Sequence, residues 1–330
     1  MAPGLVDPFR RTLSYLRVSV TDRCDMRCIY CMPEDMRFLP REDVLTLHEL
    51  ENICRSFIRK GIRRVRLTGG EPLVRGGVMD FIASLGQLVQ SGDLDELTLT
   101  TNGARLVDHA EALAKAGVRR VNVSLDSLEA PKFARITRSG RLDVVLEGVR
   151  AAKAAGLLVR INTVVLAGVN EDELDTIVEW CGRQRLDLAL IETMPIGETQ
   201  SAHYNMHVPM TIVRERLARH WTLEESDYRT GGPARYFCVA ENKCRIGFIT
   251  PMSHGFCDSC NRMRLTCAGV LHTCLGHENG VDLRKALRSD PEGKTVETVI
   301  DEAVRAKPHG HDFLAANSEK VRRHMNATGG

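Results

Sequence analysis

Residues 15–31 read YLRVSVTDRCDMRCIYC, a short apolar strand followed at once by three cysteines. The alternating branched residues of 15–20 predict a β-strand. Cys24, Cys28 and Cys31 then fall on the loop after this strand, and no fourth Cys or His follows closely. Because α/β proteins carry functional residues on the loops at the carboxyl ends of their strands, the stretch predicts a first strand with a thiol site at its end.

The strand pattern recurs five more times before residue 195. Runs rich in β-branched residues predict strands at 64–68, 96–101, 120–125, 159–165 and 189–194. Stretches with the apolar spacing of helices separate them, and glycines suited to end a helix precede three of the strands. This alternation predicts parallel strands covered by helices. Six units are too few for a closed eight-stranded barrel, so a partial barrel and an open doubly wound sheet both remain.

After Pro195 the alternation ends. We expect a helix at 210–220, short strands within 231–241 and 243–252, a second cysteine cluster and a final helical region. We therefore expect a functional boundary near residue 195, without a flexible linker, that divides the chain into residues 1–195 and 196–330.

Composition narrows the class of protein. The chain has 330 residues, 43% hydrophobic and 27% charged, with a net charge of only +2, which argues against a broad surface for nucleic acid or anionic membrane. No run of about 18 apolar residues predicts a membrane span. Eleven cysteines without a secretory signal favour metal or catalytic thiols in a reducing cytoplasm over disulfides. Four of them suggest no role beyond packing: Cys54, Cys181, Cys238 and Cys244.

The first cysteine cluster has the spacing C-x3-C-x2-C. Three readings are open: buried small side chains, zinc with a remote fourth ligand, or a 4Fe–4S cubane with three thiolates and one open iron. The spacing, with Tyr30 before the last cysteine, resembles the radical S-adenosylmethionine (SAM) superfamily. In that superfamily SAM binds the open iron and is cleaved to a 5′-deoxyadenosyl radical. Gly69-Gly70-Glu71 matches its second motif, whose glycines would let main-chain carbonyls accept from the SAM amino group.

The second cluster lies in CDSCNRMRLTCAGVLHTC (257–274). A zinc ribbon on all four cysteines and a three-thiolate cluster on Cys257, Cys260 and Cys274 are both compatible with the spacing, which does not exclude Cys267. Residues 262–267 and 270–275 predict a hairpin. Arg262 and Arg264 would project from one face of it.

Arginines are the expected phosphate ligands, because guanidinium forks bind phosphate oxygens bidentately and stay charged. No P-loop occurs, so side chains would have to hold a nucleotide. Three further arginines lie on predicted strands whose carboxyl ends would meet at one side of the sheet: Arg17, Arg66 and Arg160. Each could instead be a solvated strand residue with no ligand.

Together these motifs closely resemble the GTP 3′,8-cyclase family, from about residue 8 to the end of the chain. The segments that carry the resemblance are LRVSVTDRCDMRCIYCMP (16–33), RLTGGEPL (66–73), TTNG (100–103), NVSLDSL (122–128), INTV (161–164), FCDSCNRMRLTCAGVLHTCL (256–275) and the terminal Gly-Gly. The resemblance implies an α/β fold, an incomplete (βα)6 TIM-like barrel whose open side is closed by a C-terminal α+β region. It also implies two 4Fe–4S clusters, one for SAM and one whose open iron takes the guanine of GTP.

The resemblance assigns roles by motif position. Six cysteines would bind the clusters, with Cys267 left out: Cys24, Cys28, Cys31, Cys257, Cys260 and Cys274. The SAM site would contain Tyr30, Gly69, Gly70, Glu71, Ser124 and Met194. GTP would contact Arg17, Arg66, Thr100, Arg160, Arg262 and Arg264. The catalytic set would be Arg17, Arg262 and Arg264, together with Gly329 and Gly330 of a tail that inserts toward the active site.

The implied reaction opens molybdenum cofactor biosynthesis. The radical would take hydrogen from the ribose C3′ of GTP, and C3′ would attack guanine C8 to give 3′,8-cyclo-7,8-dihydro-GTP. The product would pass to cyclic pyranopterin monophosphate synthase, and a homodimer is implied, while the sequence does not identify the electron donor. Two alternatives stay open: another radical SAM enzyme with an auxiliary cluster, such as a peptide maturase, or a non-enzymatic zinc protein.

Overall fold

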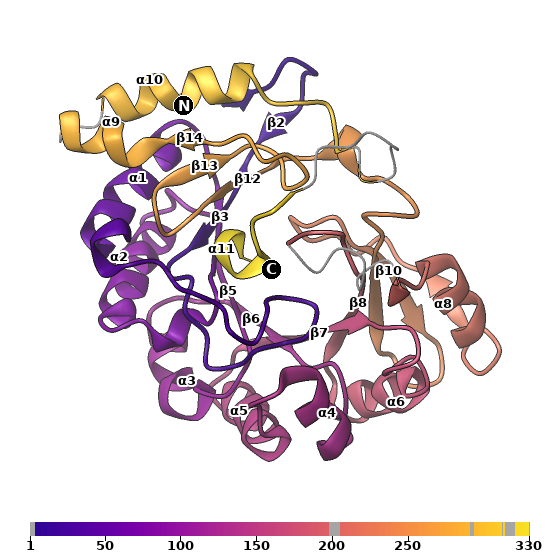
Figure 1. The fold of residues 1–330 in the computed structure, drawn as a ribbon. Helices are drawn as coiled ribbons and strands as arrows, with labels where there is room; N and C mark the ends of the chain where they lie inside the picture. Colours follow the sequence, from indigo (N-terminus) through magenta and orange to yellow (C-terminus); the bar gives the residue numbers. More distant parts are fainter. Residues whose placement is uncertain (1–3, 198–204, 291–293, 312, 314–320, 330) are drawn as a thin grey trace.

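A curved sheet organises the chain. The computed structural model describes residues 4–197, 205–290, 294–311, 313 and 321–329. In this part of the chain, twelve strands pair in the order β14-β13-β12-β3-β4-β5-β6-β7-β8-β11-β10-β9 (Figure 1). Strands β3 to β8 run parallel and agree with the six predicted strands to within two residues: β3 (Tyr15–Ser19), β4 (Arg64–Thr68), β5 (Glu96–Thr101), β6 (Arg120–Ser124), β7 (Leu158–Val165) and β8 (Asp187–Glu192).

Helices cover the outer face of this sheet (Figure 1). Helix α1 shows why these segments are helical. Thr46 and Glu49 form a capping box at its start, and its apolar face is buried through Leu50, Ile53 and Phe57. Short 3₁₀ turns, η1 (Arg41–Asp43) and η2 (Pro72–Val74), precede α1 and α2. The outer helices are α1 (Leu47–Arg59), α2 (Val78–Gln90), α3 (Leu106–Lys115), α4 (Ala130–Thr137), α5 (Leu142–Ala154) and α6 (Leu174–Gln184).

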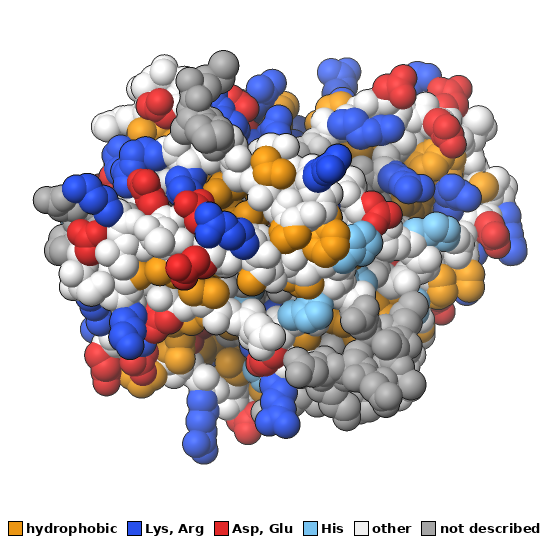
Figure 2. Space-filling model, turned by 90° about the horizontal axis from the view of Figure 1, so that it is seen from above, with side chains coloured by type: hydrophobic (Ala, Val, Ile, Leu, Met, Phe, Trp, Pro, Cys, Tyr) orange, Lys and Arg blue, Asp and Glu red, His pale blue; other side chains and the backbone are white. Residues whose placement is uncertain are grey.

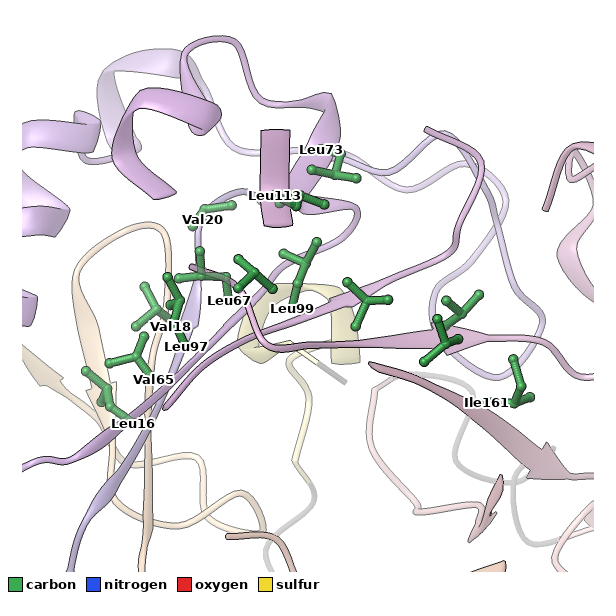
Figure 3. Packing of buried hydrophobic residues seen from close by; sticks show 14 of the residues in the cluster. Leu16, Val18, Val20, Val65, Leu67, Leu73, Leu97, Leu99, Leu113 and Ile161 are labelled. Atoms are coloured by element: carbon green, nitrogen blue, oxygen red, sulfur yellow. The ribbon is translucent and has the colours of Figure 1, made fainter. Parts of the chain in front are cut away.

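The apolar core lies between the sheet and these helices. Leu16, Val65 and Leu97 are paired in register on neighbouring strands and are fully buried, as are Val18, Leu67 and Leu99 one row further on (Figure 3). Side chains alternate between the faces of a strand, so the intervening residues point to the inner face of the curve. Those residues are polar, which leaves the inside of the curve free for a polar site.

The C-terminal part extends both edges of the sheet. On one edge β12 (Arg262–Leu265) runs parallel to β3 and continues through antiparallel β13 (Val270–His272) and β14 (Val281–Asp282), which confirms the predicted hairpin. On the other edge β11 (Arg245–Ile249) runs parallel to β8, followed by β10 (Arg235–Val239) and β9 (Leu223–Glu225). A separate two-stranded sheet pairs β1 (Leu5–Val6) with β2 (Thr12–Leu13).

The remaining helices lie on and within this extended sheet. Helices α9 (Leu283–Ser289) and α10 (Lys294–Arg305) pack on α1, while α8 (Met210–Leu217) lies on the side of β8. The short helix α11 (Met325–Thr328) sits inside the curve of the sheet (Figure 1). The fold is thus an incomplete TIM-like barrel of six parallel units, as expected, with C-terminal strands added at both of its edges.

The outer surface carries both signs of charge. On the face drawn in Figure 2, Lys and Arg side chains are interspersed with Asp and Glu. None of the helices in the described residues is both long and apolar enough to cross a membrane.

Candidate active site

Two cavities lie side by side within the barrel. The first is lined by Cys24, Cys28 and Cys31 and by the ends of the parallel strands. The second is lined by arginines together with Cys257, Cys260 and Cys274. Four residues line both cavities, so the two share a wall: Asn162, Ile191, Met194 and Met325.

The two glycines after β4 let the cysteine loop approach the sheet. The N–H of Gly70 donates to Thr21 O at 2.8 Å, and that of Glu71 donates to Arg23 O at 2.8 Å. A Cβ placed on Gly69 would lie 2.5 Å from Thr21 O, and one on Gly70 would lie 2.3 Å from Arg23 O. Close packing against the loop that leads to Cys24 therefore requires glycine at both positions, independently of any contact with a ligand.

The thiols of the first cavity lie among carboxylates. Burial raises the pKa of Cys24 to about 12, with a further contribution from the charge of Glu71. Burial likewise raises the pKa of Cys31 to about 12 and that of Cys28 well above its ordinary value, and Asp126 adds to both shifts. Uncharged thiols are thus favoured until a metal binds, because metal coordination deprotonates cysteine.

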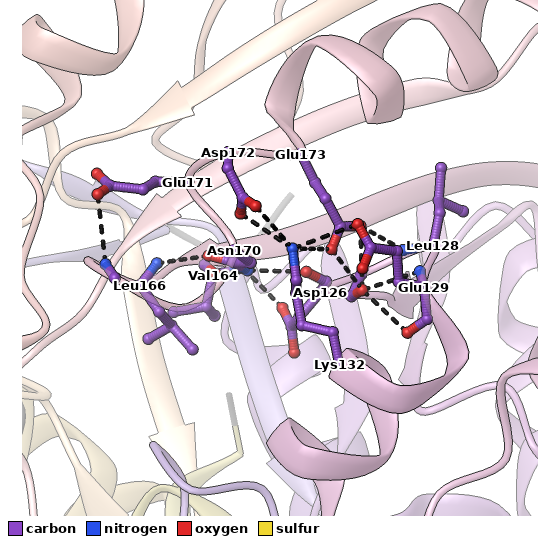
Figure 4. Close-up of polar contacts among 12 residues, drawn as sticks. Asp126, Leu128, Glu129, Lys132, Val164, Leu166, Asn170, Glu171, Asp172 and Glu173 are labelled. Atoms are coloured by element: carbon purple, nitrogen blue, oxygen red, sulfur yellow. Dashed lines mark hydrogen bonds and ion pairs between the residues drawn. The ribbon is translucent and has the colours of Figure 1, made fainter.

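Asp126 orients Tyr30 beside the cysteine loop. The Tyr30 hydroxyl donates to Asp126 Oδ2 at 2.8 Å, and Val164 N donates to the other carboxylate oxygen at 2.8 Å. Asn170 and the ion pair of Lys132 with Glu173, at 2.6 Å, hold the loop after β6 in place (Figure 4). Asp126 is a site residue that the sequence reasoning did not single out, although it lies within the segment NVSLDSL.

The Glu71 side chain does not line either cavity. It is fully buried and accepts hydrogen bonds from Leu73 N at 3.0 Å, Thr101 Oγ1 at 2.9 Å and Asn102 N at 2.6 Å. Burial raises its pKa to about 7. Its carboxylate therefore joins the loops after β4 and β5. It does not face the cavity in which SAM is expected.

Replacing Glu71 with glutamine is expected to destabilise the fold by about 2 kcal/mol, because an amide nitrogen would face a donor. Chemical denaturation under anaerobic conditions measures the change. Glu147→Gln, at an exposed position of α5, is the matched control. Equal stability of the two variants would contradict this role of Glu71.

A row of arginines forms one wall of the second cavity. Arg264 of β12, Arg17 of β3 and Arg66 of β4 are paired in register across three parallel neighbours, so their side chains share one face. Burial lowers the pKa of Arg17, and the charges of Arg264 and Arg66 lower it further. Burial and the charge of Arg262 lower the pKa of Arg264 to about 9. Closely spaced cations of this kind suit a polyanionic ligand.

Local contacts hold the arginines in place. Arg66 lies over the Tyr15 ring at 5.4 Å, and Arg262 lies over the Phe256 ring at 4.8 Å. Arg160 donates to the Tyr236 hydroxyl at 2.9 Å. Within the described part of the chain, no ion pair with a carboxylate forms at Arg66, Arg160, Arg262 or Arg264. These positions are therefore lining residues of a cavity and not members of a solvated strand edge.

Cys267 lies apart from the other three cysteines of its cluster. It is 1% exposed, its carbonyl accepts from Leu45 N at 2.8 Å, and it does not line the second cavity. Arg11 holds the loop of Cys257 by donating to Cys257 O at 2.6 Å and to Pro308 O at 2.9 Å. Among the described residues, no three His, Cys, Asp or Glu side chains converge closely enough to hold a single metal ion.

The structure brings most of the expected site residues together. Those expected around SAM line the first cavity, with the exception of Glu71: Tyr30, Gly69, Gly70, Ser124 and Met194. Those expected around GTP line the second, with the exception of Thr100: Arg17, Arg66, Arg160, Arg262 and Arg264.

Thr100 differs because it stands at the next-to-last position of β5, closer to the strand end than Arg66 is on β4, and it lines the first cavity. Its buried hydroxyl has no hydrogen-bond partner within the described residues. Phe256, His272 and Met325 also line the second cavity; the first two lie within the segment 256–275 that carries the resemblance, but the sequence analysis gave none of the three a role.

The C-terminal tail enters the barrel between the cavities. Arg264 donates to Gly329 O and to Thr328 O, the latter at 3.3 Å. The side-chain amide of Asn326 donates to Asp22 O at 2.9 Å, close to the first cysteine loop. Gly329 has a φ of +74°, and a Cβ there would lie 1.9 Å from Thr68 Oγ1. Gly330 lies outside the described residues.

Comparison with known proteins agrees with this arrangement. Residues 18–181 match the radical SAM superfamily, and residues 186–313 match the family described as Molybdenum Cofactor Synthesis C. The crystal structure of Streptococcus suis SuiB bound to S-adenosylmethionine has a similar fold, with a TM-score of 0.62 at 16% identity, covering 96% of this chain and 77% of that one.

Curated relatives are similar over their full lengths. GTP 3′,8-cyclase of Bradyrhizobium diazoefficiens is 54% identical, covering 100% of this chain and 97% of the relative. GTP 3′,8-cyclase of Mesorhizobium japonicum is 52% identical, covering 99% of this chain and 100% of the relative. With both cysteine sets, the arginine row and the inserted tail in place, the chain belongs to the GTP 3′,8-cyclase family of the radical SAM superfamily.

Proposed function

We propose that this chain is a lyase that converts GTP to 3′,8-cyclo-7,8-dihydro-GTP in molybdenum cofactor biosynthesis. One observation carries the proposal: a cavity with three thiols shares a wall with a second cavity that combines three further thiols and five arginines. This arrangement would bring a radical source and a nucleotide triphosphate into contact through Asn162, Met194 and Met325.

The residues of the first cavity fit a 4Fe–4S cluster with SAM. Cys24, Cys28 and Cys31 supply three soft ligands and leave one iron open. The unpartnered hydroxyl of Thr100 and the backbone at Gly69 and Gly70 offer polar contacts for SAM. When bound, the cluster and SAM supply the carbon radical that removes a hydrogen atom from the substrate.

In the second cavity, the protein would position GTP. The row of Arg17, Arg66 and Arg264 would bind the triphosphate, and Arg160 and Arg262 would flank it. Cys257, Cys260 and Cys274 would hold a second 4Fe–4S cluster whose open iron takes the guanine. GTP would thus be held at its triphosphate and at its guanine, so that its ribose lies at the wall that the two cavities share. The surrounding protein would exclude water and competing hydrogen donors.

Further parts of the proposal concern organisation and partners. Residues 1–195 would serve the radical chemistry and residues 196–330 the substrate, with Gly329 and Gly330 of the tail completing the site. We also propose that the enzyme is a homodimer in the cytoplasm, where the ligand thiols stay reduced. Its product would pass to cyclic pyranopterin monophosphate synthase.

Anaerobic reconstitution with iron, sulfide, SAM, reductant and GTP tests the function. We expect about eight irons per chain, 5′-deoxyadenosine, and a cyclised product derived from GTP. One or two zinc ions in place of iron would instead indicate a structural zinc protein. Formation of 5′-deoxyadenosine with unchanged GTP would contradict the proposal and favour a radical SAM enzyme that modifies a peptide.

A further inference from the structure

Lys307 is a buried cation at the second cysteine set. It follows α10, and only 3% of its surface is exposed. Its ammonium group contacts Cys260 Sγ at 3.8 Å and donates to Arg262 O at 3.2 Å and to Thr273 O. These contacts join the segment of Cys260 to the residue before Cys274. One side chain thus links the two segments that carry the three thiols.

No carboxylate balances this charge in the described part of the chain, since none of its ion pairs involves Lys307. The charged side chains that line the second cavity with these thiols, Arg262 and Arg264 among them, are also cations. Burying an unbalanced ammonium group is strongly unfavourable, so a buried lysine is normally paired with a negative group. The acidic groups that it does contact or approach are the thiols of Cys260 and Cys274.

We propose that Lys307 is the counter-ion of the 4Fe–4S cluster at Cys257, Cys260 and Cys274, and that it makes this cluster easier to reduce. The inference rests on the proposed function, which places a cluster at these cysteines. Three thiolates make such a site negative, and reduction adds one more negative charge. A fixed ammonium beside a ligand sulfur stabilises the reduced state, since nearby charge and hydrogen bonds to sulfur set cluster potentials.

The two thiol sets differ in the sign of the charged side chains around them. At the second set the Lys307 ammonium lies 3.8 Å from Cys260 Sγ, and Arg262 and Arg264 line the same cavity as the thiols. At the first set the Asp126 carboxylate accepts from Tyr30, which lies between Cys28 and Cys31, and a carboxylate there disfavours added negative charge. The cluster beside Lys307 is therefore the easier of the two to reduce.

The test uses the full chain with Cys24, Cys28 and Cys31 changed to alanine, so that only the second cluster contributes a signal. Four versions are compared: unchanged Lys307, Lys307→Gln, Lys307→Met and Lys307→Arg. Lys285→Gln, at an exposed position of α9, is the matched control for loss of one positive charge. Iron content and an anaerobic redox titration followed by electron paramagnetic resonance are the readouts.

In Lys307→Gln and Lys307→Met we expect the ratio of reduced to oxidised cluster at a fixed potential to fall about tenfold, a shift of about 59 mV for one electron. Lys307→Arg and Lys285→Gln should match the unchanged chain. Loss of iron in the two neutral variants with retention in Lys307→Arg would also support the proposal. Full iron with an unchanged potential in either neutral variant would overturn it, as would equal damage in Lys307→Arg. If the chain with unchanged Lys307 binds no iron, the proposed second cluster itself fails.

Discussion

Arg264→Ala is expected to lower GTP cyclisation about 100-fold while SAM cleavage stays within a few-fold of wild type. Arg264 lies in the arginine row of the second cavity and donates to two carbonyls of the tail. Loss of these charge-assisted bonds corresponds to about 3 kcal/mol, or roughly two factors of ten in rate. The first cavity does not include Arg264, so radical formation should be largely unaffected.

The measurement is the ratio of cyclised product to 5′-deoxyadenosine in one anaerobic reaction. Arg262→Ala should behave in the same direction, because Arg262 lines the same cavity. Arg288→Ala serves as the control, since the Arg288 side chain is half exposed and pairs with Glu49 away from both cavities. Equal loss of both products in Arg264→Ala would assign the residue to the stability of the barrel and not to cyclisation.

Gly329→Ala is expected to reduce cyclisation on the order of 100-fold, with both clusters still assembled. The added Cβ would overlap Thr68 Oγ1, and the φ of +74° is already unfavourable for alanine. The tail could then no longer keep its place between the cavities, and displacements of about 1 Å in a catalytic site can lower rates by two orders of magnitude. Product formation and iron content are measured together.

Gly168→Ala separates the effect of the positive φ from the effect of the collision with Thr68. Gly168 has a similar φ of +66°, but a Cβ there meets no atom within 4 Å. It therefore carries the backbone strain without the collision, and its activity should stay near that of wild type. Appending two residues to the tail should resemble Gly329→Ala. Full cyclisation in Gly329→Ala would show that the tail does not need its position against Thr68.

Local sequence patterns were sufficient to predict the parallel strands and the hairpin. The predicted strands agree with β3 to β8 because period-two apolar residues can bury one face of a strand only in that conformation. The hairpin at 262–275 followed for the same reason, with Gly269 in the turn at a φ of +84°. The sequence pattern did not distinguish a partial barrel from an open doubly wound sheet, because the strands that extend both edges of the sheet come from a distant part of the chain.

Side-chain environments were harder to predict than strands. The GGE motif placed Glu71 among the residues expected around SAM, but it did not indicate that the carboxylate is buried and accepts from the donors of 73, 101 and 102. Asp126 and Lys307 were missed because a single carboxylate or ammonium has no spacing that marks it. Their roles depend on partners 96 and 47 residues away, Tyr30 and Cys260.

Residue types and short spacings were enough to indicate the type of chemistry: two sets of three cysteines, a GGE segment after a strand, and arginines on neighbouring strands. These features depend on residue type and short spacing, which the chain carries locally. Which of these groups meet depends on the folded chain. It paired Arg264, Arg17 and Arg66 in one row, separated Cys267 from the other three thiols, and placed Gly329 against Thr68. Strand register and packing bring together residues hundreds of positions apart, and spacing along a single chain does not contain that information.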